Sequence, residues 1–178
     1  FTVIKLLSFT DELSSPSELT INPTGDTLYY INNTASNTGK TNGVIAQAIE
    51  AKRQCLVLSE RKEHIAILSE QLNTQGINTI ELHGGVSTKI RKQRIELIQK
   101  GLPERTVIIA TGKYVGEGFD LPYLDTLFLA LPISWKGIVA QYAGRIQRHH
   151  PNKTEVTVHD YVDDFPMLQR MWKKRANG

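Results

Sequence analysis

Apolar and polar positions follow a regular order from about residue 54 to the end of the chain. Short, nearly continuous apolar runs predict buried strands over residues 55–58, 78–82, 106–110, 125–131 and 155–162. Between these runs, apolar residues recur at helical spacing and predict helices over 61–73, 87–100, 137–147 and 165–174. Strands that alternate with helices indicate βαβ units, whose right-handed crossovers build a parallel sheet. We therefore expect an α/β domain of three layers, with a mostly parallel central sheet flanked by helices.

The first fifty residues follow a different pattern. Residues 2–9 are rich in Val, Ile and Leu, and this predicts a strand. Residues 10–27 are rich in Ser, Pro, Thr, Asn, Asp and Gly, which is typical of loops. A short apolar run at 28–31 precedes a polar stretch over 32–42 that we expect to be exposed, and helical spacing continues over 42–52. We expect residues 1–50 to be a connector and edge segment from a preceding N-terminal region, and 51–178 to be the main domain. The first residue is Phe1 rather than Met, which favours a fragment of a longer protein.

Composition and charge narrow the class of protein. With 178 residues, of which 40% are hydrophobic and 22% charged, the chain has the length and balance of one globular domain and is not disordered. No apolar run reaches the roughly 18 residues of a membrane span. The single cysteine, Cys55, excludes an internal disulfide, and the histidines lack the spacing of metal ligands. We expect a cytoplasmic protein with no metal site of its own and no membrane partner; its net charge of +3 is compatible with a polyanionic partner.

The most specific motif in the chain is Gln141-x-x-Gly144-Arg145-x-x-Arg148. On a helix these positions share one face, while the opposite face carries apolar residues that can pack on the sheet. Two guanidinium groups about one turn apart can bind the oxygens of a polyphosphate, and Gly144 between them allows a close approach. The alternative interpretation is a solvated basic helix face.

A glycine-rich segment over residues 110–122 follows one of the predicted strands. Backbone amides beside glycines such as Gly112 and Gly118 can approach phosphates, and Thr111 can add a hydroxyl. Asp120 can accept a hydrogen bond from a ribose hydroxyl. The alternative is a mobile glycine loop without a ligand.

A third segment, Gly39-Lys40-Thr41, matches the end of a phosphate-binding P-loop, G-x-x-x-x-G-K-[ST]. The first glycine of that motif would stand at position 34, where this chain has Thr34, and no strand ending in paired acids follows at a useful distance to hold magnesium. A polar surface loop is therefore the better interpretation. A self-contained P-loop NTPase that uses Lys40 is the alternative.

Taken in order, four segments of the chain resemble the second RecA-like domain of superfamily 2 helicases, the DEAD/DEAH-type nucleic-acid translocases. The resemblance covers residues 52–165, and the stretch 116–148 is similar to bacterial helicases of the restriction or mobile-element type. Its segments are 56–59 with Arg61, His83-Gly84 with Arg91, 110–120 and 141–148. The resemblance implies a RecA-like fold and a motor that uses ATP and Mg²⁺, both held mainly by an N-terminal RecA-like domain of the same protein.

The resemblance also implies roles for single residues. Arg148 would be an arginine finger and Arg145 its companion on the triphosphate; Gln141 and Gly144 would face the nucleotide, and Gly118 and Asp120 would lie near the ribose. Nucleic acid, DNA rather than RNA although RNA is not excluded, would be contacted through its backbone. The residues for that contact are Ser59, Arg61, Thr111 and Gly112.

The resemblance makes a prediction about activity and leaves two alternatives. A lone second domain has half of an ATP site, so the 178-residue chain by itself should not hydrolyse ATP. The first alternative is a non-motor nucleic-acid-binding module of the same fold, against which the intact arginine pair argues; the second is the P-loop NTPase.

Overall fold

The computed structural model describes residues 3–9, 17–20, 27–33, 38–116, 119–130, 141–142, 144–161, 166–167 and 170. Its strands are β1 (Val3–Phe9), β2 (Ser17–Thr20), β3 (Thr27–Asn33), β4 (Cys55–Leu58), β5 (Asn78–Leu82), β6 (Thr106–Ala110), β7 (Thr126–Leu129) and β8 (Glu155–Tyr161). Its helices are α1 (Thr38–Glu50), α2 (Lys62–Thr74), α3 (Thr88–Gln99) and α4 (Gly112–Gly116).

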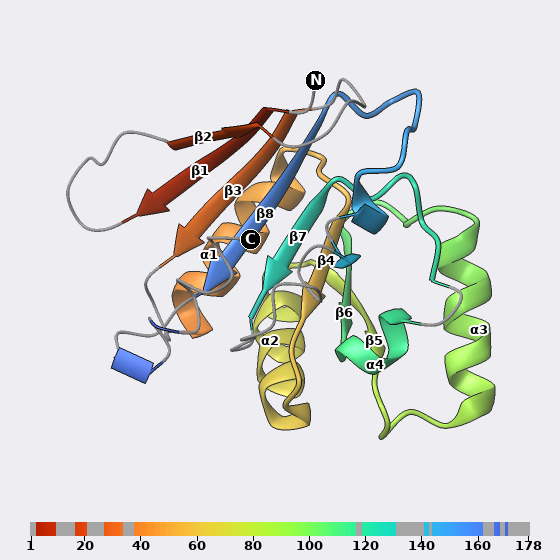
Figure 1. Ribbon diagram of the computed structural model, residues 1–178. Coiled ribbons are helices and arrows are strands. Elements are labelled where there is room, and N and C mark those ends of the chain that lie inside the picture. The colour runs from red at the N-terminus through yellow and green to blue at the C-terminus, as the bar shows by residue number, and fades with distance from the viewer. Residues whose placement is uncertain are drawn as a thin grey trace.

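The described strands form one sheet in the order β2-β1-β3-β8-β7-β4-β6-β5 (Figure 1). Neighbouring strands are parallel throughout, except for the antiparallel pair of β1 and β2. The predicted α/β class with a mostly parallel sheet is therefore confirmed. Because β4, β6 and β5 are parallel neighbours, the segments that follow them meet at one edge of the sheet.

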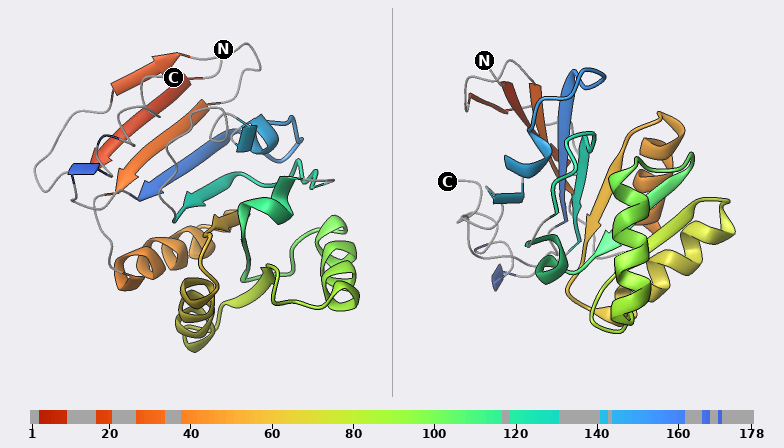
Figure 2. Two further views of the ribbon diagram at one scale, coloured as in Figure 1. Left: turned by 60° about the horizontal axis from the view of Figure 1, so that its bottom comes forward. Right: turned by 90° about the vertical axis from the view of Figure 1, so that its right-hand side faces the viewer.

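Helices cover both faces of the sheet, as the alternation of side chains along the strands requires. In β4, Cys55 and Val57 join an apolar cluster with residues of α1 and α2, while Leu56 and Leu58 join a second cluster with α3 and the segments around 119–124 and 142–146. Figures 1 and 2 show α1 and α2 side by side on the same face. The three-layer arrangement places the segment around Tyr142 and Ile146, which carries the arginine motif and is called the arginine segment below, on the face opposite α1 and α2.

Arg53 ties together the amino-terminal ends of β4, β7 and β8. Its guanidinium donates to Thr126 Oγ1 at 2.9 Å, to Glu155 Oε1 at 2.6 Å and to the Asp125 carbonyl at 3.2 Å. Burial raises the pKa of the Asp125 carboxyl, an effect that the charge of Arg53 partly opposes. These contacts of Arg53 hold the amino-terminal ends of the strands together. The candidate ligand-binding segments follow the carboxyl ends, at the opposite edge of the sheet.

Several predicted boundaries differ from the structure. The loop expected over 10–27 contains β2, a short edge strand whose order comes from pairing with β1 rather than from its own polar sequence. Helix α1 begins at Thr38, inside the polar stretch expected over 32–42, because the buried residues Ile45 and Ile49 in its later turns anchor a helix whose first turns are polar. The glycine-rich segment forms α4 directly after β6, and Ser87 caps α3 by accepting from the Ile90 amide.

Across the part of the chain that the structure describes, no helix is both long and apolar enough to pass through a membrane.

Candidate nucleotide and nucleic-acid site

Three residues of the motif, Gln141, Gly144 and Arg145, lie on a helical segment whose two faces differ as the spacing predicts, whereas Arg148 lies in a bend just after the last helical residue. Gln141–Tyr142 and Gly144–Ile146 are helical. Tyr142 and Ile146 are buried against the sheet, at 9% and 1% exposure, whereas Gln141 and Gly144 are exposed. The apolar face therefore holds the segment on the domain and turns the Gln141 and Gly144 face outward.

Both arginines of the motif contact two consecutive residues of the glycine-rich segment. Arg145 Nη1 donates to the Phe119 carbonyl at 3.0 Å, and Arg148 Nη1 forms an ion pair with the Asp120 carboxylate. Arg145 is half-buried, while the side chains of Arg148 and Asp120 are 56% and 52% exposed. The structure thus brings Arg145, Arg148 and Asp120 together; Gly118, predicted beside them, lies outside the described residues.

The surface at Gly144 is open. A Cβ atom built there would meet no described atom within 4 Å, so the described part of the chain does not require a glycine at this position. The close approach expected at Gly144 is therefore not made by the described parts of this domain.

Gly112 packs between residues of two other segments. Its amide donates to Glu60 Oε1 at 2.9 Å, and a Cβ atom there would lie 2.8 Å from that oxygen and closer still to Tyr142 Oη. Burial and the charge of Glu60 raise the pKa of Tyr142, and Arg145 partly opposes this shift. Gly112 thus joins the end of β4, the start of α4 and the arginine segment in one contact, which needs a residue without a side chain.

Ser59 and Thr111, two of the predicted nucleic-acid contacts, have buried side chains. Ser59 is 1% exposed and its hydroxyl lies 2.9 Å from His64 Nδ1; Thr111 is 8% exposed. Arg61, at the N-cap of α2, is exposed. Of these three side chains, only Arg61 is placed to reach a ligand outside the domain as the structure stands.

The sequence analysis singled out Arg91 and Gly84 but did not predict that Arg91 joins Lys62, Lys113 and Tyr114 in one cluster at the same edge of the sheet. The Arg91 guanidinium lies 4.8 Å, and Lys113 Nζ 5.9 Å, from the centre of the half-buried Tyr114 ring. A Cβ atom at Gly84 would contact Tyr114 Oη and the end of Lys62, so these side chains converge over Gly84. The signal that could have found them is the Lys113-Tyr114 pair inside the glycine-rich segment.

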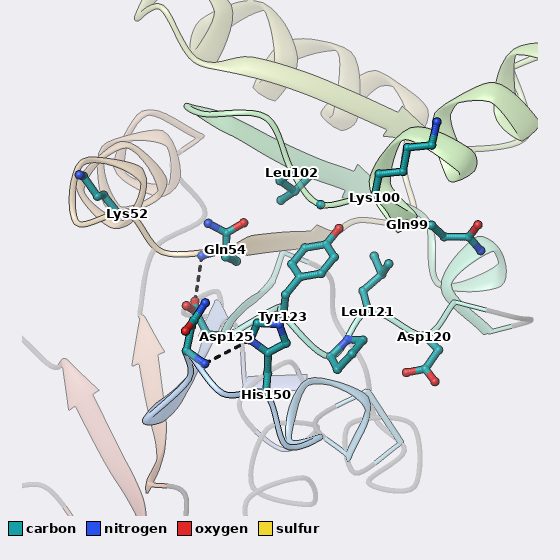
Figure 3. Close-up of a pocket in the computed structure, with 13 residues that line it drawn as sticks. Lys52, Gln54, Gln99, Lys100, Leu102, Asp120, Leu121, Tyr123, Asp125 and His150 are labelled. Atoms are coloured by element: carbon teal, nitrogen blue, oxygen red, sulfur yellow. Dashed lines mark hydrogen bonds between the residues drawn. The ribbon is translucent and has the colours of Figure 1, made fainter.

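A cavity of about 570 Å³ lies on the other side of Asp120. Figure 3 shows Tyr123 between Lys52 at one end of the cavity and Asp120 at the other. The Tyr123 hydroxyl donates to the Ile98 carbonyl at 2.5 Å, and burial raises its pKa. The fold therefore holds this wall of the cavity in place, and Asp120 both lines the cavity and forms the ion pair with Arg148.

Two further predictions concern metal and the P-loop-like segment. Among the residues that the structure describes, no three His, Cys, Asp or Glu side chains gather into a possible metal site. Gly39, Lys40 and Thr41 lie in the first turn of α1 rather than in a loop. Residues 34–37, which a P-loop would also need, are outside the described ranges, so the P-loop alternative stays a prediction.

Comparison with known proteins identifies the class. Residues 40–150 match the helicase conserved C-terminal domain family, and the chain belongs to that family. It is similar to an uncharacterized protein of Invertebrate iridescent virus 3 (38% identity over 73 residues, 41% of this chain and 66% of that protein) and to a probable helicase of Escherichia phage T5 (32% identity, 60% and 23%). A putative ATP-dependent helicase of Saccharomyces cerevisiae is 26% identical over 71% of this chain and 19% of its own length. The chain thus spans only part of each relative.

Solved structures agree on the fold. The C-terminal part of the Fun30 ATPase domain superposes with a TM-score of 0.64 at 16% identity, covering 77% of this chain and 44% of that chain. The second domain of the DEAD-box helicase Mss116p, solved bound to an RNA duplex, gives 0.59 at 16% identity and covers 78% and 55%. The predicted resemblance to a second RecA-like helicase domain is confirmed.

Proposed function

We propose that this chain is the second motor domain of an ATP-dependent nucleic-acid helicase or translocase. In this proposal, an N-terminal RecA-like domain of the same protein faces the segment 141–148, and ATP binds between the two. The observation that carries the proposal is that two arginines three residues apart contact adjacent residues of the glycine-rich segment: Arg145 contacts Phe119 and Arg148 contacts Asp120. Two separate motifs of the sequence therefore form one exposed site.

The residues present suit a triphosphate. Arg148 is half exposed and its partner is a carboxylate at the surface, so phosphate oxygens can take the place of Asp120 at modest free-energy cost. The open space at Gly144 lets an anion approach the helix backbone. When bound, ATP supplies the phosphoanhydride bond whose hydrolysis drives the motor.

Each residue then has a distinct task. Arg148 donates to the transferred phosphoryl group and stabilises its developing charge. Arg145, half-buried and held by the Phe119 carbonyl, keeps a second guanidinium in place beside it. Gln141 and Gly144 face the nucleotide, and Asp120 and Gly118 lie on the ribose side. We assign Mg²⁺ to the preceding domain, because no three His, Cys, Asp or Glu side chains gather into a possible metal site among the residues that the structure describes.

Nucleic acid binds, in this proposal, at the carboxyl ends of β4, β5 and β6. Because the side chains of Ser59 and Thr111 are buried, the phosphate contacts fall mainly on exposed cations at this edge, Arg61, Lys62 and Lys113, with Gly112 supporting them from below. Such contacts position the strand without reading its sequence. DNA is the proposed substrate, and RNA is an outcome of the test.

Two features favour a motor over a non-motor binding module. A pure binder gains little from a second arginine held in place by a backbone carbonyl, and Gly144 leaves open a space that the described fold of this chain does not use. As half of a site, the isolated chain should show no ATPase above background.

The test is the ATPase of the full-length protein with single-stranded DNA or RNA of equal length. We expect Arg148→Ala to bind a non-hydrolysable ATP analogue within a few-fold of wild type and to lose about 10³-fold or more in kcat. The matched control is Arg61→Ala, which removes another exposed guanidinium and should lower nucleic-acid stimulation while leaving basal ATPase intact. Near-normal turnover in Arg148→Ala, or robust ATPase from the isolated chain, would refute the proposal.

A further inference from the structure

Lys153 is a buried lysine in the turn that leads into β8. It is 7% exposed. Its Nζ donates to the carbonyls of Pro122 at 2.7 Å, Leu124 at 3.2 Å and Ile146 at 2.6 Å. An ammonium group has three protons to donate, so these contacts use all of them.

The three carbonyls belong to the two segments that form the candidate ATP site. Ile146 directly follows Arg145 and is the last helical residue before the bend at Arg148. Pro122 and Leu124 lie two and four residues after Asp120. Lys153 therefore joins, from inside the domain, the same two segments that Arg145 and Arg148 join at its surface.

The chemistry of this position calls for a cation. The last carbonyls of a helical segment have no partner within it and carry partial negative charge. A buried ammonium costs free energy unless hydrogen bonds compensate for its lost water, and three carbonyls provide that compensation. Burial raises the pKa of the Asp125 carboxyl, and the charge of Lys153 is close enough to oppose this shift slightly.

The surface contacts alone would hold the arginine segment weakly. The Arg148–Asp120 pair is more than half exposed on both sides, and such pairs contribute only about 0–1 kcal/mol. If nucleotide takes the place of Asp120, even this contact is lost at the moment when Arg148 acts. The buried contacts of Lys153 do not depend on that exchange.

We propose that Lys153 is a positioning residue for Arg145 and Arg148, because it fixes the end of the helical segment that carries Arg145 and precedes Arg148 relative to the segment that carries Asp120. This inference rests on the proposed function, because it gives the two arginines their role. A displacement of about 1 Å at a catalytic group can cost on the order of 10²-fold in rate. Lys153 therefore acts on turnover without touching substrate.

The first experiment compares Lys153→Met with Lys153→Gln in the full-length protein. Met keeps the length of the side chain and removes all three donors; Gln keeps two donors on a shorter chain. We expect kcat to fall in the order wild type, Gln, Met, by at least about tenfold for Met. KM for ATP and the Kd for single-stranded DNA should stay within about threefold. If Lys153→Met does not fold, Lys153→Gln decides: wild-type kcat in that variant overturns the proposal.

The matched control for lost stability is Leu72→Ala. Leu72 is fully buried in the apolar cluster on the α1 and α2 face, away from the arginine segment, so this change leaves a cavity and should clearly lower the melting temperature. Assayed at a temperature well below both melting points, Leu72→Ala should keep its kcat. An equal loss of kcat in Leu72→Ala would show that Lys153 acts only through stability and would overturn the proposal.

The double variant Lys153→Met/Arg148→Ala separates the inference from the function on which it rests. Because Lys153 acts through the arginines, the double variant should turn over within about threefold of Arg148→Ala alone. Full multiplication of the two single losses would overturn the positioning role. Normal kcat in Arg148→Ala would overturn the proposed function, whereas a loss in Arg148→Ala with none in Lys153→Met would overturn only the inference.

Discussion

Arg148 forms an ion pair with Asp120, a residue 28 positions earlier in the chain, and both side chains are more than half exposed. An ion pair in this setting is well solvated, so its partners can be exchanged. The same exposure lets both groups reach a ligand. In the function that we propose, the pair is therefore two site residues that hold each other in the free domain rather than a stabilising bridge.

This view predicts a small coupling free energy between the two residues. In a double-mutant cycle with Asp120→Asn and Arg148→Ala, we expect the coupling in unfolding free energy to be below about 1 kcal/mol. Denaturant unfolding of the four proteins measures it. Asp120→Asn should still raise KM for ATP, because the carboxylate lost from the site is the one we assign to the ribose side. A coupling of several kcal/mol would instead indicate a structural bridge.

Gly112 and Gly144 provide a contrasting pair of glycine-to-alanine changes. Gly112→Ala forces a methyl group against Glu60 and Tyr142, so we expect a loss of about 1–3 kcal/mol in unfolding free energy. Gly144→Ala adds a methyl group to an open helical position and should stabilise the protein by about 0.5–1 kcal/mol. If nucleotide fills the open space, Gly144→Ala should nevertheless raise KM for ATP. Unchanged ATP kinetics in the stabilised Gly144→Ala protein would place the nucleotide elsewhere.

The strands that the sequence predicts best are those buried on both faces. All residues of β4, β6 and β7 are buried, and their apolar runs appear in the sequence as uninterrupted blocks. β2 and α4 were missed for the opposite reason: β2 is a polar edge strand ordered by its neighbour, and α4 is a single turn that begins at Gly112. The local sequence pattern is enough to predict β4, β6 and β7, whereas β2 and α4 depend on tertiary contacts.

The candidate site divides in the same way. Helical spacing was enough to predict that Gln141 and Gly144 face outward while Tyr142 and Ile146 are buried. It could not show that Arg145 donates to the Phe119 carbonyl, or that Lys153 reaches back to Pro122. The partners in these hydrogen bonds are 26 and 31 residues apart. Because every residue has a backbone carbonyl, the residue types do not indicate which carbonyl accepts the bond.

His159 predicts a loss of stability in acid. It is 8% exposed, and its ring stacks on Phe128 with centroids 4.5 Å apart. Burial, together with the charge of Arg53, lowers its pKa from 6.5 to about 4. Because the unfolded chain binds this proton more readily, the stabilisation is complete above pH 6.5 and is lost as pH falls from there towards 4, by up to about 3 kcal/mol.

The pH dependence can be assigned to this residue by comparison with His159→Phe. Phenylalanine keeps the stacking on Phe128 and removes the titrating group. Between pH 7.5 and 4.5, the unfolding free energy of wild type should fall more steeply than that of His159→Phe, whatever their difference at pH 7.5. Parallel curves for the two proteins would show that His159 titrates normally or that other groups dominate.

Lys40 tests the remaining alternative, a self-contained P-loop. It lies in the first turn of α1, at the start of the residues that match the helicase family, and position 34 holds Thr34 where a P-loop needs glycine. If α1 is simply a helix that covers the sheet, Lys40→Ala should leave the affinity for ATP and kcat within about twofold of wild type, because alanine suits a helix at least as well as lysine. Arg148→Ala should show the contrasting pattern of near-normal binding and lost turnover. A collapse of ATP binding in Lys40→Ala would place the triphosphate at the start of α1 and move the nucleotide site away from the arginine segment.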